Sequence, residues 1–149
     1  MTKSEKLNFL ILFLLGGVSS FSLPPYNLFF INFISFTFLF LFLVEAKNSN
    51  KSKLIFFLYG WFFGFGYFIC SLYWISISLT FDNNFKFLIP ISIICIPAFI
   101  SIFFGIATLI TKFFLSQKKI ISSVLIFSLV LSIIAVSYTH LTLPTTLVV

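Results

Sequence analysis

The sequence predicts an all-α membrane protein, a polytopic bundle of about five transmembrane helices with a cytoplasmic N-terminus. The chain of 149 residues is 60% hydrophobic, has a mean hydropathy of +1.20 and carries charge on only 8% of its residues. A typical soluble domain has about a quarter of its residues charged, so this composition excludes a soluble core. Two further observations complete the prediction: the apolar residues form runs of spanning length, and the lysines gather in alternate loops.

Each expected span is a continuous apolar run bounded by a short polar segment. A helix needs about 20 residues to cross a hydrocarbon layer of roughly 30 Å. The continuity of the runs favours helices, because the strands of a membrane barrel would alternate apolar and polar residues over shorter segments. The expected spans are residues 7–22, 26–44, 54–80, 88–111 and 120–136.

The lysines set the expected orientation of these spans. Lys3 and Lys6 precede the first span, three lysines lie between the second and third, and three more lie between the fourth and fifth, whereas the opposite side carries only Lys86. The positive-inside rule then places the N-terminus in the cytoplasm. The same asymmetry accounts for the formal net charge of +6. No nucleic-acid partner is expected, since the lysines are scattered and form no basic patch.

The first span, residues 7–22, has two readings. Its preceding lysines, its apolar stretch and the small residues Ser20 and Ser22 resemble a secretory signal peptide. We expect it to remain as an anchor, because Pro24 and Pro25 form a turn that leads directly into the second span. Proline fixes φ and lacks an amide hydrogen, so this pair ends one helix and can begin the next.

The second span, residues 26–44, carries one strongly polar side chain. This is Asn32, with Ser35 one helical turn further along. An amide in hydrocarbon needs a hydrogen-bonding partner, so we expect Asn32 to point into the bundle. It is therefore a candidate for helix packing or lipid binding.

The third span, residues 54–80, carries a stripe of small, hydroxyl-bearing and aromatic residues. Their spacing of three and four residues places them on one helix face. Small residues let helix backbones approach, so we expect this stripe to face other helices while Phe62 and Phe65 face lipid. The stripe is a candidate for ordinary helix packing or for lipid binding. It consists of Gly60, Gly64, Tyr67, Ser71, Trp74 and Ser78.

The fourth and fifth spans, residues 88–111 and 120–136, repeat the pattern of small residues on one face. Pro97 lies within the fourth span and is expected to kink it, because proline removes a helical hydrogen bond. The small and hydroxyl-bearing residues are Ala98, Ser101, Gly105 and Thr108 on the fourth span and Ser128, Ser132 and Ala135 on the fifth.

The residue types reveal no catalytic or metal-binding constellation. Cys70 and Cys95 lie within spans without a CxxC spacing, and apolar surroundings disfavour a reactive thiolate. Gly64 and Gly66 lack the third glycine and the preceding strand of a nucleotide-binding loop. Asp82 lies in an Asn-rich loop and is expected to be solvated. We therefore expect no catalytic residue, no metal and no cofactor.

Two motifs, in this order, resemble the N-terminal region of apolipoprotein N-acyltransferases. They are GGVSSFSLPPYNLFFINFISFTFLFLF, from residue 16, and GWFFGFGYFICSLYWISISLTF, from residue 60. In that family a glycine-bearing first helix leads to a turn of proline and an aromatic residue, and a later helix carries a glycine-rich motif followed by Trp and Ser. The resemblance covers about residues 7–110. The matching positions are Pro25, Tyr26, Gly60, Gly64, Phe65, Gly66, Trp74 and Ser78.

The resemblance implies the chemistry of a longer protein. Members of the family are similar in having eight membrane helices and a nitrilase-like domain with a Glu, Lys and Cys triad on the outer side of the bacterial inner membrane. The thiolate takes an acyl chain from a phospholipid as a thioester and passes it to the amino group of a lipoprotein's diacylglyceryl-cysteine. The implied partners are therefore phospholipid and lipoprotein acyl chains, held beside that domain by a membrane-embedded, multi-pass bundle.

The chain departs from the family pattern after the fifth span. The family continues with a helix bearing Trp, Glu and Arg and then with the catalytic domain, whereas this sequence continues as SYTHLTLPTTLVV. That segment is rich in threonine and contains no Phe, Ile, Lys or Asn. We expect residues 1–136 to be the N-terminal transmembrane domain, residues 137–149 to be a non-native tail, and the chain alone to be inactive without the nitrilase-like domain.

The alternative is a small polytopic transporter or structural membrane protein that is complete as it stands. Transport usually places charged or strongly polar groups within the spans. Asn32 is the only comparable group in the five expected spans, so the sequence favours the acyltransferase interpretation.

Overall fold

The computed structural model describes the chain apart from residues 1–2, 25, 79–88, 117–119 and 143–149, and it describes the backbone alone at residues 3–4, 73–78, 89 and 138–142. The described residues form five α-helices joined by turns, and they include no strand. All five helices are long and apolar enough to cross a membrane. The predicted all-α fold class is confirmed. In chain order the elements are α1 (Lys3–Ser19), the 3-10 turn η1 (Ser20–Ser22), α2 (Phe30–Asn48), α3 (Lys53–Ser78), α4 (Ile89–Phe114) and α5 (Ile120–Thr142).

The connection between α1 and α2 is longer than the sequence predicts. Asn27 adopts a positive φ of 54°, and its backbone N–H donates to the carbonyl of Leu23 at 3.2 Å. Asparagine tolerates this left-handed conformation better than most residues and is common in turns. Helix α2 therefore begins at Phe30 and not at Tyr26. Pro24 lies in this turn, whereas Pro25 falls outside the described residues.

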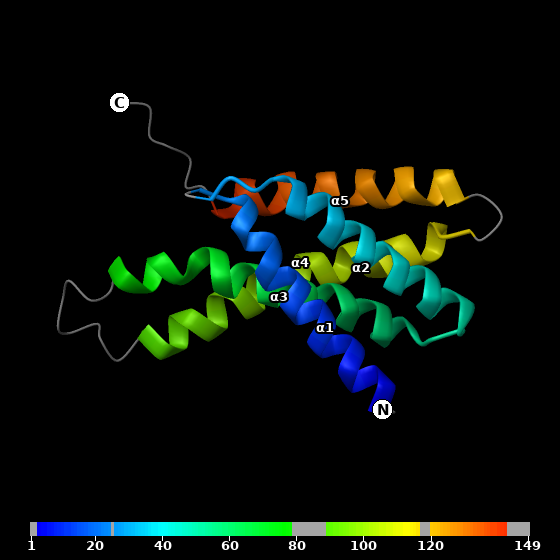
Figure 1. The fold of residues 1–149 in the computed structure, drawn as a ribbon, viewed down its shortest axis with the longest axis horizontal. Coiled ribbons are helices and arrows are strands. Elements are labelled where there is room, and N and C mark those ends of the chain that lie inside the picture. The colour runs from blue at the N-terminus through cyan, green and yellow to red at the C-terminus, as the bar shows by residue number, and fades with distance from the viewer. Residues whose placement is uncertain (1–2, 25, 79–88, 117–119, 143–149) are drawn as a thin grey trace.

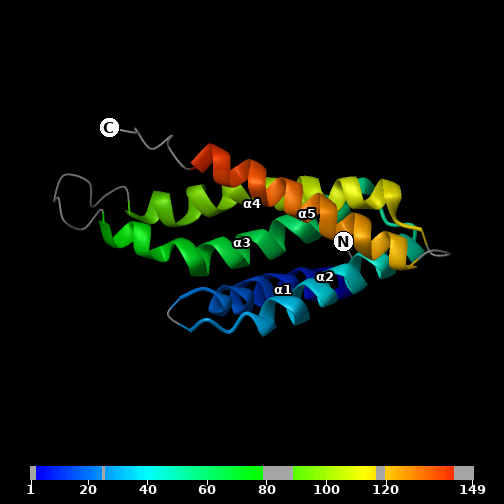
Figure 2. The same ribbon diagram turned by 90° about the horizontal axis from the view of Figure 1, so that it is seen from above.

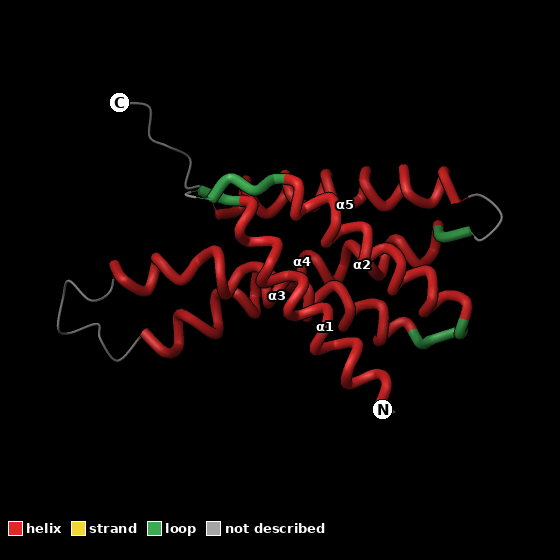
Figure 3. Tube along the Cα trace, viewed as in Figure 1, coloured by secondary structure: helices red, strands yellow, loops and turns green. Residues whose placement is uncertain are grey.

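Helix α3 occupies the middle of the bundle. Figure 2 shows α1 and α2 on one side of α3, and α4 and α5 on the other side. The most extensive contacts join α3 to α4, followed by those between α3 and α1 and between α4 and α5. Consecutive helices run antiparallel, as the tube in Figure 3 makes clear. In Figure 1 the C-terminal half of α3 and the N-terminal half of α4 extend as a pair beyond the other helices.

The contact between α1 and α3 is a close approach of two backbones. A Cβ atom on Gly16 would lie 1.9 Å from the carbonyl oxygen of Phe63, and one on Gly66 would lie 2.0 Å from that of Phe13. Both distances are far below van der Waals contact, so neither glycine can carry a side chain here. This use of glycine is the usual way for membrane helices to maximise packing.

The contact between α3 and α4 also depends on glycines. A Cβ atom on Gly60 would lie 2.3 Å from the carbonyl oxygen of Phe104, and one on Gly64 would lie 2.9 Å from the Cβ of Phe104. On the opposing helix, a Cβ on Gly105 would lie 2.6 Å from the ring of Phe57. The two glycines of the predicted stripe therefore lie against α4.

Two rings of α3 differ from their expected position. Phe62 and Phe65 were expected to face lipid, but both are only partly exposed because α1 covers this side of α3. The Phe62 ring stacks on Phe9 with a centroid distance of 5.0 Å, and the Phe65 ring lies 6.0 Å from that of Phe13. The expectation was wrong because α3 is a central helix and not a peripheral one.

The outer surface of the bundle is strongly apolar. Phe33 on α2 is 70% exposed and Ile121 on α5 is 80% exposed, and large apolar side chains are exposed on α1 and α4 as well. Apolar patches of this extent are uncommon on soluble monomers. In a bilayer the same side chains contact lipid tails, so the exposure fits a membrane protein.

Lysine side chains tie the helices together at one end of the bundle, which we call the lysine-rich end. Lys51 forms a salt bridge of 2.7 Å with Glu5 of α1. The Lys47 ammonium donates to the carbonyl of Lys112 at 3.0 Å, and the Lys112 ammonium donates to the carbonyl of Lys51 at 2.7 Å. These contacts join the ends of α1, α2 and α4 to the loop before α3.

Candidate functional site

A cleft of about 560 Å³ lies between α2 and α5. Tyr67 of α3 and Phe104 of α4 also line it, so four helices contribute to its walls. The volume falls within the range of roughly 300–1,000 Å³ that is usual for small-molecule and cofactor sites. We call this feature the α2–α5 cleft and treat it as the candidate functional site.

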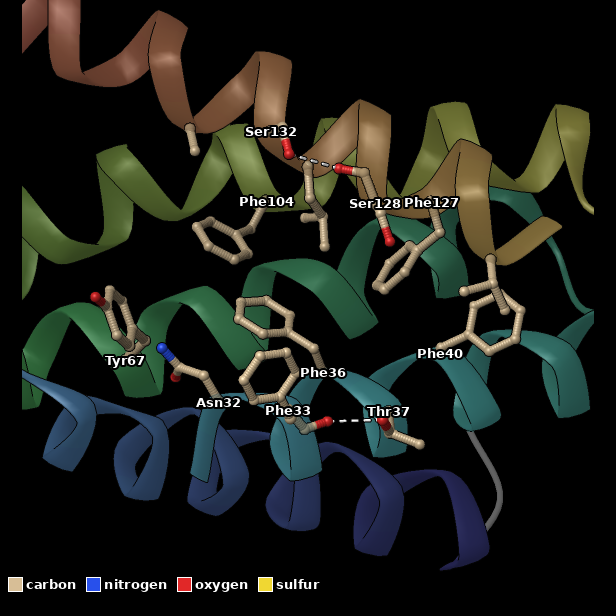
Figure 4. Close-up of a pocket in the computed structure, with 13 residues that line it drawn as sticks. Asn32, Phe33, Phe36, Thr37, Phe40, Tyr67, Phe104, Phe127, Ser128 and Ser132 are labelled. Atoms are coloured by element: carbon tan, nitrogen blue, oxygen red, sulfur yellow. Dashed lines mark hydrogen bonds between the residues drawn. The ribbon is translucent and has the colours of Figure 1, made fainter. Parts of the chain in front are cut away.

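Aromatic and aliphatic side chains form most of the walls of the cleft. Phe36 on α2 lies nearly parallel to Phe104 on α4, with ring centroids 6.5 Å apart. Phe104 is itself held in place by rings of α3 behind it, including Phe68 at 5.7 Å in an edge-on arrangement. Figure 4 shows the rings of Phe36 and Phe104 projecting into the space between the helices. The walls are therefore largely apolar and fixed by packing.

One end of the cleft is closed by two rings. Phe40 of α2 and Phe127 of α5 have centroids 5.4 Å apart and planes inclined at 47°. Their exposed fractions are only 7% and 4%. Both residues lie nearer to the lysine-rich end than the remaining rings of the cleft do. Figure 4 shows Asn32 and Tyr67 at the opposite end.

Two hydroxyl groups in the lining are bonded to their own helices. The Thr37 hydroxyl donates to the carbonyl of Phe33 at 2.6 Å, and the Ser132 hydroxyl donates to the carbonyl of Ser128 at 2.8 Å. Such bonds to the preceding turn are common for Ser and Thr in helices. Neither hydrogen is therefore available to an occupant of the cleft. The Ser128 side chain leans into the cleft in Figure 4.

Asn32 lies at the end of the cleft opposite the ring pair. The hydroxyl of Ser19, a fully buried residue at the end of α1, donates a hydrogen bond to Asn32 Oδ1. Because the oxygen is used in this way, the amide nitrogen is turned toward Tyr67 on the floor of the cleft (Figure 4). Asn32 thus connects α1 to the cleft and places a hydrogen-bond donor at this end of it.

The stripe predicted on α3 separates into two groups. Gly60 and Gly64 pack against α4, whereas Tyr67 lines the cleft. The Ser71 hydroxyl is buried and has no hydrogen-bond partner among the described residues. The side chains of Trp74 and Ser78 lie outside the described part of α3. The role of the stripe in lipid binding remains a prediction.

Sequence reasoning did not single out the rings that line the cleft. Phe36, Phe40, Phe104 and Phe127 are four of 25 phenylalanines, and no local pattern separates them from those that contact lipid. Only the pairing of helices that are distant in the chain brings them together. Asn32 was found because an amide is unusual within a span.

The described residues include no cluster of His, Cys, Asp or Glu that could bind a metal ion. Cys70 and Cys95 are free and exposed on the helix surface, away from the fully packed core. The acidic and basic side chains whose positions are described belong to the helix ends and the loop at the lysine-rich end. Asp82 and Lys86 fall outside the described residues.

Comparison with known proteins identifies the family. The family described as "Apolipoprotein N-acyltransferase N-terminal domain" matches residues 15–147. This chain belongs to the apolipoprotein N-acyltransferase family. The match confirms the resemblance seen in the sequence and includes most of the segment after residue 136. The expectation that residues 137–149 are non-native stays a prediction, and α5 continues into this segment as far as Thr142.

Curated apolipoprotein N-acyltransferases are similar to this chain over about two thirds of its length. The protein of Rhizobium etli (strain CIAT 652) is 36% identical over 108 residues, which cover 68% of this chain and 20% of the relative. The protein of Rhizobium rhizogenes (strain K84) is 34% identical over 109 residues, which cover 69% of this chain and 20% of the relative. The protein of Brucella melitensis biotype 1 (strain 16M) is 31% identical over 106 residues, which cover 67% of this chain and 20% of the relative. The aligned region thus spans about a fifth of the length of these acyltransferases. No solved structure is significantly similar to this one.

Proposed function

We propose that this chain is the N-terminal membrane domain of an apolipoprotein N-acyltransferase in the bacterial inner membrane, and that its α2–α5 cleft holds an acyl chain of a substrate. In the whole enzyme, a cysteine thiolate would attack the ester of a phospholipid, forming a thioester and releasing a lysophospholipid. The amino group of the lipoprotein cysteine would then attack the thioester, forming an amide and regenerating the thiol. The residues of this chain contribute binding and positioning to that sequence of steps.

The observation that carries this proposal is the chemical character of the cleft. Aromatic and aliphatic side chains form most of its walls, and the hydroxyls of Thr37 and Ser132 are bonded to their own helices, so that Asn32, Tyr67 and Ser128 are the lining residues with other polar groups. A polar solute would leave its donors and acceptors unsatisfied against such walls, which is costly in an apolar medium. A hydrocarbon chain has none to satisfy, so it is the occupant that these walls suit best.

The free energy of binding of an acyl chain in this cleft is expected to be small. An acyl chain that enters from the bilayer leaves lipid and not water, so the hydrophobic effect contributes little to its binding. Dispersion contacts with the fixed rings provide the gain, and each such contact is small. Weak binding suits a substrate that must enter, react and leave within each catalytic cycle.

The orientation of the cleft supports the same proposal. The positive-inside rule places the lysine-rich end in the cytoplasm. The ring pair Phe40 and Phe127 lies nearer to that end, so the end marked by Asn32 faces the outer half of the bilayer. We infer that an acyl chain enters there, and we call this end the mouth of the cleft. An acyl chain entering there would keep its ester toward the outer surface, where the family resemblance places the catalytic domain.

Photocrosslinking tests the proposal directly. The chain would be placed in lipid nanodiscs with a phospholipid that carries a diazirine on one acyl chain, irradiated, digested and analysed by mass spectrometry. We expect adducts to concentrate on Phe36 and Phe127 and to fall when unlabelled phospholipid competes. Adducts spread evenly over outward-facing residues such as Leu10 and Ile121 would contradict the proposal.

A further inference from the structure

We propose that Phe40 and Phe127 determine the length of acyl chain that the α2–α5 cleft accepts. This inference rests on the proposed function, because it assigns a selectivity to the same site. The two rings come from different helices and meet at the closed end of the cleft, with centroids 5.4 Å apart. A chain that enters at Asn32 would end against them.

The depth of the cleft is comparable to the length of a membrane acyl chain. The helical rise from Asn32 to Phe40 along α2 is about 12 Å at about 1.5 Å per residue. One leaflet of a hydrocarbon layer of roughly 30 Å is about 15 Å thick, and its acyl chains fill that thickness. A chain of ordinary length therefore reaches the ring pair, whereas a longer one must bend or leave its ester outside the mouth.

The ring pair has solid packing behind it. Toward the lysine-rich end, Leu43 on α2 is fully buried and Ser123 on α5 is 3% exposed. The Ser123 hydroxyl donates to the carbonyl of Ser116 at 3.1 Å and accepts from its N–H at 2.9 Å. On the outer side Val124 of α5 also lines this end of the cleft and is 40% exposed. On the core side the rings have little space into which they can retreat, because packed interiors lack voids of ring size.

At the open end of the cleft, Asn32 would fix the position of the ester, so that the length of the acyl chain is measured from there. The Asn32 amide is oriented by the hydrogen bond that it accepts from Ser19. Its NH₂ group can donate to the carbonyl of an ester at the mouth of the cleft. With the ester bound there and the terminal methyl group stopped by the rings, the distance between the two ends selects chain length.

The experiment measures which lipids the chain retains. The protein in mixed micelles would be offered an equimolar series of phosphatidylethanolamines that differ only in acyl length, and bound lipid would be quantified by native mass spectrometry. Phe127→Ala should move the preferred acyl length upward and raise the ratio of longer to shorter lipids severalfold, because removing the ring lets a longer chain fit without bending. Phe127→Trp should move the preference downward.

A matched variant separates length selection from general binding. Phe33→Ala removes a ring from the side wall near the mouth, so retention should fall by the same factor for every length. Circular dichroism and size-exclusion chromatography would verify that each variant remains helical and monodisperse. If Phe127→Ala is misfolded, Phe127→Trp and Phe40→Leu provide the same comparison.

The outcomes distinguish the two proposals. Opposite shifts for Phe127→Ala and Phe127→Trp support the length-selecting role. Lipid retention with an unchanged length preference would overturn that role while leaving the proposed function intact. If the unmodified chain retains no lipid and gives no photoadduct within the cleft, both proposals fail.

Discussion

The hydroxyl of Thr108 on α4 donates a hydrogen bond of 2.7 Å to the main-chain carbonyl of Phe56 on α3. Thr108 is fully buried, and its hydroxyl also approaches the carbonyls of Phe104 and Gly105 on its own helix, at 3.2 and 3.0 Å. A Cβ on Gly60 would lie 2.3 Å from this hydroxyl oxygen. The bond therefore forms only because Gly60 lets the two helices approach, so that packing and hydrogen bonding reinforce one another.

Replacing Thr108 with valine should destabilise the bundle. Valine keeps the shape but removes the donor, and hydrogen bonds between membrane helices contribute about 0.6 kcal/mol on average, with a maximum of about 1.7 kcal/mol. Steric-trap unfolding in bicelles would measure the change. Thr37→Val is the matched control, because Thr37 is exposed and bonds only within α2. Equal losses of unfolding free energy for Thr108→Val and Thr37→Val would contradict the prediction.

Two adjacent glycines of α1 should respond differently to alanine. Gly16→Ala places a Cβ 1.9 Å from the carbonyl oxygen of Phe63, so α1 and α3 must separate. Overpacking of this kind typically costs about 1–3 kcal/mol. Gly17→Ala places its Cβ 3.4 Å from the Cys70 sulfur, which is ordinary contact, and should be tolerated. Steric-trap unfolding would compare the two variants. Similar free energies of unfolding for both would contradict the close contact between the α1 and α3 backbones at Gly16.

The ion pair between Lys51 and Glu5 predicts a loss of stability at alkaline pH. The hydrogen bond with Glu5 is the main cause that raises the pKa of Lys51 above its usual value, with desolvation acting in the opposite direction. A raised pKa in the folded state stabilises the protein below the usual lysine pKa, and this contribution disappears as pH rises through the raised value.

Lys51→Met should therefore lower the free energy of unfolding at neutral pH, and its difference from the parent chain should shrink as the pH rises past the lysine range. The expected change in unfolding free energy is small because the Lys51 side chain is about a third exposed, so that solvent screens the ion pair. Lys6→Met, at an exposed lysine of α1, is the control and should show no such convergence. A constant difference for Lys51→Met across the alkaline range would rule out the ion pair as its cause.

The chain by itself should form no acyl-enzyme. Its two cysteines are exposed on helix surfaces, and the acidic and basic side chains that the structure describes belong to the lysine-rich end. Acyl transfer to a thiol needs an adjacent general base that activates it. Incubation with a phospholipid radiolabelled in its acyl chain, followed by hydroxylamine treatment, would test this. Hydroxylamine-sensitive label on Cys70 or Cys95 would refute the prediction.

The fold was largely predictable because hydropathy is a local property of the sequence. Five apolar runs gave five helices, since each run must satisfy its own backbone hydrogen bonds in a bilayer. The start of α2 was not predictable, because it depends on the positive φ of Asn27 in the preceding turn. Whether Asn27 adopts that conformation depends on hydrogen bonds of the folded turn, such as the one that its N–H donates to the Leu23 carbonyl. The sequence alone does not predict these hydrogen bonds.

The candidate site was less predictable than the fold. The spacing of Gly60 and Gly64 indicates a face that packs on another helix, but it does not say that the partner is α4. Phe33 and Phe36 are both phenylalanines of α2 that line the cleft, yet Phe33 is 70% exposed at its side and Phe36 is packed against Phe104. The side that each ring faces depends on the position of α5 across the bundle, a relationship between distant parts of the chain.

The lysine contacts at one end of the bundle have a mechanical consequence for the α2–α5 cleft. They tether the neighbouring helix ends, and the Phe40–Phe127 pair adds an anchor at the base of the cleft. Rocking of α5 about this anchored base would displace its far end most, so the entrance would widen while the depth stayed constant. Substrate admission and length discrimination would then be governed by separate parts of one structure.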